Sequence, residues 1–272
     1  MPNYDQQVEE IVRTYKRAVT EILAELERFD ITDYSRANAQ ATLKSIADIL
    51  TSLNEESAKW VAENIPLAVR TGVAEAIVAL GVVSTLAEAQ QIVKFNRVNK
   101  ALVEAVIADT QADLLAVTQN VDRKVKATIR QVVSEAMRNN LAKGVNGRRT
   151  INYDTLEGLR KKLGNAVNTG IIDAAGRRWK PEVYVDTVTR TKMMRTTIEA
   201  SSNEAASRGA YYGVISSHGA KDACRDWEGR IVKLVESAPG DYPYIGSLLG
   251  SRDIFHPRCK HTVSPIRNPD RY

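Results

Sequence analysis

The chain has 272 residues, with 38 Lys and Arg against 33 Asp and Glu, so its formal net charge is +5. This length suits one large or two ordinary domains, each with its own hydrophobic core. Two cysteines, 15 glycines, 8 prolines and a hydrophobic fraction of 43% exclude a disulfide scaffold, a collagen-like repeat and low-complexity disorder. We therefore expect a soluble globular protein.

The N-terminal segment has acidic residues where a secretory signal has its basic start, and no unbroken apolar run follows it. The most apolar stretch, residues 74–86, is shorter than the roughly 20 residues of a membrane-spanning helix and contains Glu75. The sequence therefore predicts neither a secretory signal nor contact with a membrane.

Apolar residues at steps of three and four predict helices along the first half of the chain. The first such stripe is Tyr4, Val8, Ile11, Tyr15, Val19, Ile22 and Leu26. A second stripe, residues 43–53, predicts another helix, with Asn54 as the N-cap of a third helix that Pro66 should kink. Thr85 followed by Glu88 has the form of a capping box and predicts the start of a short helix.

The segment 96–142 contains neither Pro nor Gly and keeps the helical spacing, which predicts one long helix or two nearly continuous ones. A helix of this length is more typical of a scaffold or an assembly strut than of a small active site. The glycines and basic residues of 143–149 predict a turn or linker. A short basic helix is expected at 156–167, and another from Pro181 to about residue 208.

From residue 210 onward, short β-branched and aromatic runs between glycines predict a small sheet packed on the preceding helices. The expected fold is mainly α with a small C-terminal α+β domain, that is, long N-terminal helices followed by a helix-plus-small-sheet module. We place a helical region at residues 1–143 and a basic α+β domain at residues 144–272.

Charge is distributed unevenly along the chain. Residues 1–120 hold 11 basic and 17 acidic side chains, and the remainder holds 27 and 16, so the net charges are −6 and +11. A basic half is typical of a protein that contacts nucleic acid, because Lys and Arg displace condensed counterions from phosphates; a solvated basic surface is the alternative. The candidate contacts with double-stranded DNA are Arg123, Lys124, Lys126, Arg148, Arg149, Arg160, Lys161, Lys162, Arg177 and Arg178.

All histidines and cysteines lie in one short window: His218, Cys224, His256, Cys259 and His261. On a strand, Cys259 and His261 would project from the same face, and a pair from the first segment would complete a tetrahedral zinc site. The spacing is not that of a standard zinc finger. A Cys224–Cys259 disulfide and simple burial of the side chains in a small core are the alternatives, so structural zinc is a hypothesis and no other cofactor is indicated.

The same residues also allow an enzyme, with Cys259 as a nucleophile beside His256 or His261. The aspartates available to orient the histidine are Asp222, Asp226 and Asp253. No local signature of such a site is present, so we assign no catalytic residue. A metal-dependent nuclease or toxin-like enzyme built from these histidines and cysteines is the alternative function.

Three ordered motifs lie in this region: VISSHGA at 214–220, DxCxxWEGRI at 222–231 and HPxCxHxxxP at 256–265. Together with the helix at 184–196, they resemble the C-terminal part of tailed-phage minor capsid proteins, the phage minor capsid protein 2 family and the related Mu F-like head morphogenesis proteins. The resemblance covers about residues 180–266. Arg230 and Lys260 replace the family's usual Lys and Arg, which retains the charge.

The resemblance implies a low-copy head protein at the portal vertex that assists head assembly, DNA packaging or DNA delivery. The implied partners are the portal protein, the major capsid protein and double-stranded DNA, with an oligomeric arrangement on the portal ring. The implied location is the virion, in the head interior or at the portal vertex, after assembly in the host cytoplasm. Some members of the wider group carry toxin or enzyme domains after this region; six residues follow Ile266, so we expect none here.

Overall fold

The computed structural model describes residues 4–31, 35–142, 153–173, 175–251 and 253–272. The chain divides into two compact units, each made of separate segments. The helical unit comprises residues 9–59 and 111–186, and the mixed unit comprises residues 1–8, 60–110 and 187–272. The predicted linker at 143–149 and the predicted boundary after residue 143 lie outside the described residues, and the two predicted domains stay a prediction.

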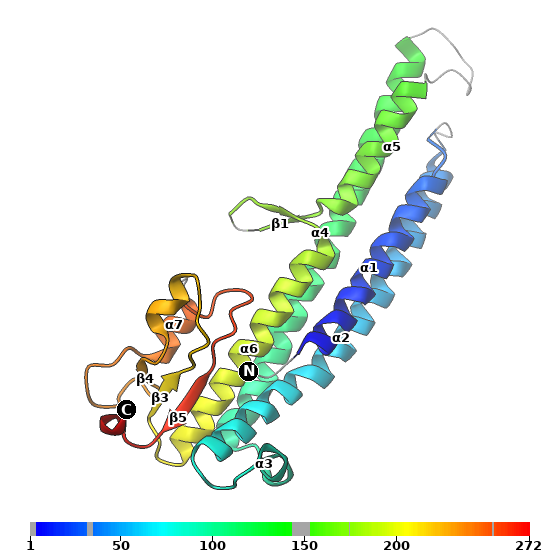
Figure 1. Ribbon diagram of the computed structural model, residues 1–272. Coiled ribbons are helices and arrows are strands. Elements are labelled where there is room, and N and C mark those ends of the chain that lie inside the picture. Colours follow the sequence, from blue (N-terminus) through cyan, green and yellow to red (C-terminus); the bar gives the residue numbers. More distant parts are fainter. Residues whose placement is uncertain (1–3, 32–34, 143–152, 174, 252) are drawn as a thin grey trace. The chain divides into compact units, whose positions relative to one another are not determined.

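The fold is mainly α with small antiparallel sheets, as the sequence predicts. The α-helices are α1 (Asp5–Arg28), α2 (Arg36–Ala79), α3 (Leu86–Ile92), α4 (Arg97–Ala142), α5 (Tyr153–Asn168), α6 (Pro181–Ser207) and α7 (Ile245–Gly250) (Figure 1). None of the helices in the described ranges has a stretch that is long and apolar enough to span a bilayer.

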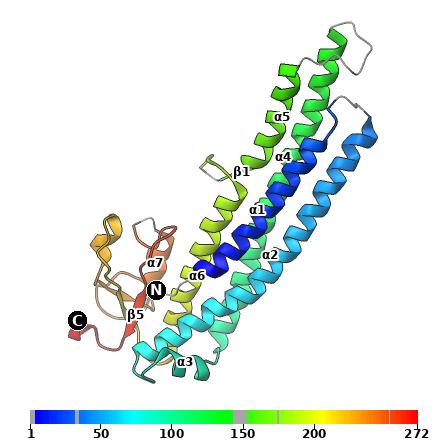
Figure 2. The ribbon, with the colours of Figure 1, turned by 45° about the vertical axis from the view of Figure 1, so that its right-hand side comes forward.

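The helical unit consists of α1, the first part of α2, the second part of α4, and α5, followed by the hairpin β1 (Ile171–Ile172) and β2 (Arg178–Trp179). The predicted stripe of α1 is buried, with Val19 half-buried. In α4, the residues at helical spacing from Leu114 to Ala136 are buried. Helices α4 and α5 run side by side in both views, joined by an ion pair between Lys162 Nζ and Glu135 Oε2 at 2.6 Å (Figures 1 and 2).

The capping prediction at Thr85 is confirmed, and the one at Asn54 is wrong. The Thr85 hydroxyl accepts from the Glu88 N–H at 3.2 Å, and the Glu88 carboxylate accepts from the Thr85 N–H at 3.1 Å. Helix α2 instead continues through Asn54 and Pro66, so the expected third helix does not begin there. The Asn54 side chain accepts from the Thr118 hydroxyl at 2.7 Å, an interhelical hydrogen bond with α4 that occupies the acceptor a cap would need.

Helix α6 contributes to two hydrophobic clusters of the mixed unit. Ala200 packs with Val73 of α2 and Leu102 of α4, whereas Met194 and Ile198 belong to the core of the C-terminal sheet. A helix buried on several sides lacks a broad polar face. Its buried hydroxyls instead donate to carbonyls one turn earlier, at 2.9 Å for Thr197 and 2.8 Å for Ser202, which satisfies polar groups that water does not reach.

The predicted C-terminal sheet is present. Strands β3 (Tyr212–Ile215), β4 (Ile231–Lys233) and β5 (Val263–Ile266) are antiparallel in the order β4-β3-β5. The connection between β3 and β4 contains the 3-10 helix η1 (Ala223–Trp227), and a second short 3-10 helix, η2 (Pro269–Arg271), follows β5. Gly229, just before β4, has φ of 73°, the left-handed conformation expected of that turn.

Two adjacent leucines of α4 test the packing of the helical unit. Leu114 is 1% exposed and its neighbour Leu115 is 43% exposed. We expect Leu114→Ala to lower the free energy of unfolding by about 2–5 kcal/mol, because it removes a buried side chain and leaves a cavity. The control Leu115→Ala should change it by about 0.5 kcal/mol or less. Urea denaturation followed by circular dichroism measures both, and equal losses would contradict the assigned orientation of α4.

A pair of helical glycines tests the contact between α2 and α6. A Cβ added at Gly72 would lie 2.2 Å from the carbonyl oxygen of Thr197, whereas one added at Gly158 of α5 would meet nothing within 4 Å. We expect Gly72→Ala to destabilise the protein by about 1–3 kcal/mol, because the two helices must separate. Gly158→Ala should stabilise it by about 0.5–1 kcal/mol through helix propensity. Stabilisation by both substitutions in thermal unfolding would show that α2 and α6 are not in close contact.

Candidate functional site

A tight turn before β5 places the second half of the histidine and cysteine cluster. The Cys259 N–H donates to the His256 carbonyl at 2.9 Å, with Pro257 and Arg258 between them. Arg258 has φ of 67°. Pro at the first central position and a left-handed residue at the second are the features of a type II turn. Cys259 and His261 precede the strand, which begins at Val263, so strand alternation does not place their side chains.

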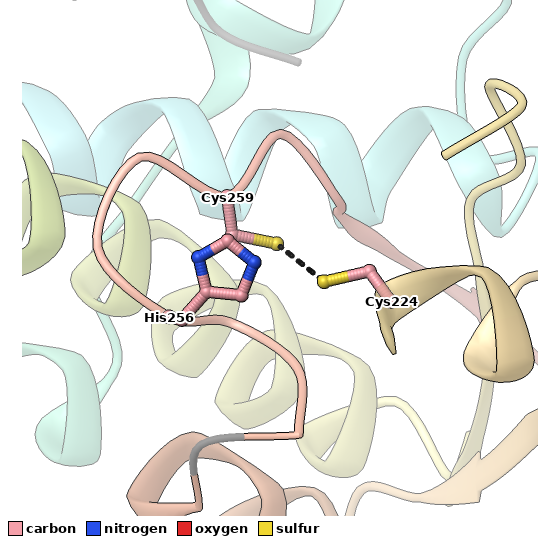
Figure 3. Close-up of side chains that lie close together, drawn as sticks. All are labelled: Cys224, His256 and Cys259. Atoms are coloured by element: carbon pink, nitrogen blue, oxygen red, sulfur yellow. Dashed lines mark hydrogen bonds between the residues drawn. The ribbon is translucent and has the colours of Figure 1, made fainter. Parts of the chain in front are cut away.

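The other cysteine is held by η1. The Asp222 carboxylate accepts from the Cys224 N–H at 3.1 Å and caps this 3-10 helix. The Sγ atoms of Cys224 and Cys259 lie 3.8 Å apart, both cysteines are buried, and both are free thiols (Figure 3). A disulfide needs about 2.05 Å between its sulfurs. Burial, together with the neighbouring Cys259, raises the pKa of Cys224 to about 12, so this thiol is neutral.

His256 and His261 both lie close to the cysteine sulfurs. The ring of His256 lies beside the two sulfurs in Figure 3, and its donor nitrogen is within 4.8 Å of both. Its Nδ1 is 3.0 Å from the Pro257 carbonyl oxygen and its Nε2 is 3.3 Å from Asp222 Oδ2. His261 is buried, with Nδ1 3.2 Å from Cys259 Sγ.

Glu228 is a site residue that the sequence-based interpretation missed. Its carboxylate is 3.2 Å from His261 Nε2 and accepts the backbone N–H groups of His218 and Ala220 at 2.8 and 3.1 Å. These backbone hydrogen bonds lower the pKa of Glu228 to about 2, so it is ionised at neutral pH. The sequence feature that could have identified Glu228 is its position before Gly229. The left-handed conformation of Gly229 lets the chain turn, and the Glu228 carboxylate then reaches the segment at 218–220.

The structure brings all five predicted residues together. They line one cleft of about 460 Å³ with Asp222 and the segment 219–221. His218 lies at its exposed side, with its ring centroid 4.2 Å from that of His261. The cleft thus presents two thiols, three imidazoles and the Asp222 carboxylate, which are metal ligands and also groups that transfer protons. The basic side chains Lys221, Arg258 and Lys260 line it as well.

The described candidates for DNA contact all lie in the helical unit. Three of them are in ion pairs: Lys126 with Asp122, Lys162 with Glu135 and Arg177 with Asp173, at 2.6, 2.6 and 2.7 Å. Arg123 donates to Asn120, and Arg160 donates to the Glu27 carbonyl. Within the described ranges, Lys124, Lys161 and Arg178 have no ion pair; Arg148 and Arg149 lie outside those ranges.

The comparisons with known proteins give one match. The model of the family described as phage minor capsid protein 2 matches residues 3–267. No curated protein and no solved structure matches the chain. Because the family match spans almost the whole chain, it includes both units and the cleft. The chain belongs to the phage minor capsid protein 2 family and has a structural role in a phage head.

Proposed function

We propose that the protein is a non-enzymatic minor component of the portal vertex that assists head assembly, DNA packaging or DNA delivery and contacts double-stranded DNA without sequence preference. The observation that carries this proposal is the family match over residues 3–267. Its partners are the portal and major capsid proteins, on an oligomeric portal ring. Its place is the portal vertex or the head interior, after assembly in the host cytoplasm.

Helix length supports a role within a large assembly. Helix α2 has 44 residues and α4 has 46, which corresponds to about 65–70 Å at 1.5 Å per residue. Both helices contribute to both units, because α2 crosses the division after residue 59 and α4 crosses the division after residue 110. Helices of this length are suited to linking separate contact sites within an assembly rather than to enclosing a small substrate.

Cations that remain unpaired support DNA contact. Lys161 and Arg178 are exposed and Lys124 is half-buried, and these three have no ion pair among the described residues. Long, mobile cationic side chains neutralise phosphates at any sequence, whereas reading of bases requires an element that enters a groove. The proposed contact is therefore electrostatic and independent of base sequence.

Matched charge reversals test the DNA contact. The test variant carries Lys124→Glu, Lys161→Glu and Arg178→Glu. We expect duplex binding by the unaltered chain to weaken steeply with salt, and the triple variant to lower the slope of log K against log salt by about 2.7, because each lost phosphate contact removes about 0.9. Fluorescence anisotropy with two duplexes of unrelated sequence measures both the slope and the absence of sequence preference.

A second triple variant serves as the control, because it changes the net charge equally. It carries Arg13→Glu, Lys16→Glu and Lys59→Glu, which alter exposed positions of α1 and α2. Its salt slope should remain closer to that of the unaltered chain. Binding that persists at high salt with a clear sequence preference, or equal losses in both variants, would overturn the electrostatic contact.

The portal partner is tested in cells. We expect the chain to co-purify with the portal protein when both are expressed without the major capsid protein, because a component of the portal vertex binds the portal directly. In complete heads, quantitative mass spectrometry should find far fewer copies of the chain than of the major capsid protein. No association with the portal and a copy number close to that of the major capsid protein would contradict the placement.

The alternative function is a metal-dependent nuclease or toxin-like enzyme. It is favoured by the contacts of His261 with Cys259 and Glu228, which place a nucleophile, a base and an orienting acid next to one another. Incubation of plasmid DNA with the chain and divalent metal separates the two functions. Cleavage that is lost in His256→Ala or His261→Ala would overturn the structural role, and intact plasmid supports it.

A further inference from the structure

Three soft donor atoms converge in the cleft. Cys224 Sγ, Cys259 Sγ and a nitrogen of His256 all lie within 4.8 Å of one another. His261 is not in this group of three, but its Nδ1 is 3.2 Å from Cys259 Sγ, which makes it the candidate for a fourth ligand. The sequence places these residues on two separate segments, so the turn at 256–259 and the helix η1 bring them together.

The distance between the two sulfurs fits shared coordination. With Zn–S bonds of about 2.3 Å and tetrahedral angles, two thiolates on one zinc ion lie about 3.8 Å apart. The observed separation is 3.8 Å. The other contacts of the two thiols are Cys224 Sγ with the Asp253 carbonyl oxygen at 3.9 Å and Cys259 Sγ with His261 Nδ1 at 3.2 Å. The S–H group is a weak donor and acceptor, so such contacts are weak compared with a zinc–thiolate bond.

The second nitrogen of each histidine has an oxygen partner. His256 Nδ1 is 3.0 Å from the Pro257 carbonyl oxygen, and His261 Nε2 is 3.2 Å from the ionised Glu228. A carbonyl or carboxylate at this position receives the N–H and fixes the tautomer, which leaves the lone pair of the other nitrogen for a metal. His256 is thus set to ligate through Nε2 and His261 through Nδ1.

Asp222 is the acidic side chain that lines the cleft, together with the basic Lys221, Arg258 and Lys260. Its Oδ2 is 3.3 Å from His256 Nε2, while its Oδ1 caps η1 at Cys224. A cation on this nitrogen would lie beside the Asp222 carboxylate, whose negative charge favours it.

Donor chemistry selects the metal. Two thiolates and two imidazoles suit zinc, whereas magnesium and calcium take oxygen ligands, and iron–sulfur clusters are normally held by four cysteines. A second group, His218, Glu228 and His261, also lies within 4.8 Å. Its carboxylate already accepts two backbone N–H groups and the His261 ring, and His218 is exposed, so this group is the weaker candidate.

We infer that the chain binds one structural zinc ion through Cys224, His256, Cys259 and His261. Two thiol protons leave to solvent when the ion binds. The ion joins η1 to the segment that leads into β5, and so closes the edge of the C-terminal core. This site is independent of the proposed contacts with DNA and portal.

Cobalt substitution tests the site directly. The full chain, purified with reductant and without chelator, should carry about one zinc per chain by elemental mass spectrometry. After removal of zinc, added Co²⁺ should give the visible bands of a tetrahedral ion together with thiolate-to-cobalt charge transfer in the near ultraviolet. Cys224→Ser and Cys259→Ser should lose the charge transfer, and His261→Ala should weaken Co²⁺ binding at least about 10-fold.

Two histidines of similar exposure provide a matched pair. The side chains of His256 and His218 are 32% and 40% exposed, so neither substitution disturbs the buried core. His256→Ala should weaken Co²⁺ binding at least about 10-fold, while His218→Ala should leave it unchanged. This pair keeps the test decisive even if a buried cysteine variant does not fold, which circular dichroism will show.

Three results would overturn the zinc site. They are a reduced, folded chain that takes up neither zinc nor cobalt; cobalt bands that persist in the folded His256→Ala variant; and binding that is lost in His218→Ala but retained in Cys224→Ser. The last would assign the metal to the group with Glu228. None of these readouts depends on DNA or on the portal protein, so failure of the zinc site and failure of the proposed function are distinguishable.

Discussion

The burial of α6 is the constraint on which the mixed unit depends. This helix has no broad polar face, because Ala200 packs toward α2 and α4 while Met194 and Ile198 pack into the core of the sheet. At Gly72 the backbones of α2 and α6 approach so closely that no side chain fits. Hydroxyls and small residues are therefore needed along α6, and they account for its Thr- and Ser-rich sequence.

Helical periodicity predicted the stripe of α1 and the long α4, because apolar spacing reports directly which face is buried. The prediction that Asn54 caps a helix failed for a physical reason. A side-chain oxygen that can cap a helix N-terminus can equally accept a hydrogen bond from a neighbouring helix, and here Thr118 donates that hydrogen bond. The division into units was also hidden, since α2 and α4 each contribute to both and no break in the sequence marks the change.

The cluster of histidines and cysteines was visible as a concentration along the chain, but its geometry was not. Cys259 lies in a turn set by Pro257 and the left-handed Arg258, and this turn, rather than strand alternation, brings His256 next to Cys259. Glu228 escaped notice because its role comes from contacts with backbone N–H groups, which the types of the residues at 218–220 do not reveal. The charge count likewise overstated the free cations, since Lys126, Lys162 and Arg177 are neutralised by neighbours.

The order of segments along the chain has a consequence for synthesis on the ribosome. Every residue of the helical unit has been made once residue 186 has emerged, whereas the mixed unit needs residues 1–8 and also β5 near the opposite end. Tyr4, which is translated before the helical unit, has its hydroxyl 2.6 Å from that of Thr197. The segment around Tyr4 must therefore wait until α6 has been translated, so the helical unit can fold first and the mixed unit closes last.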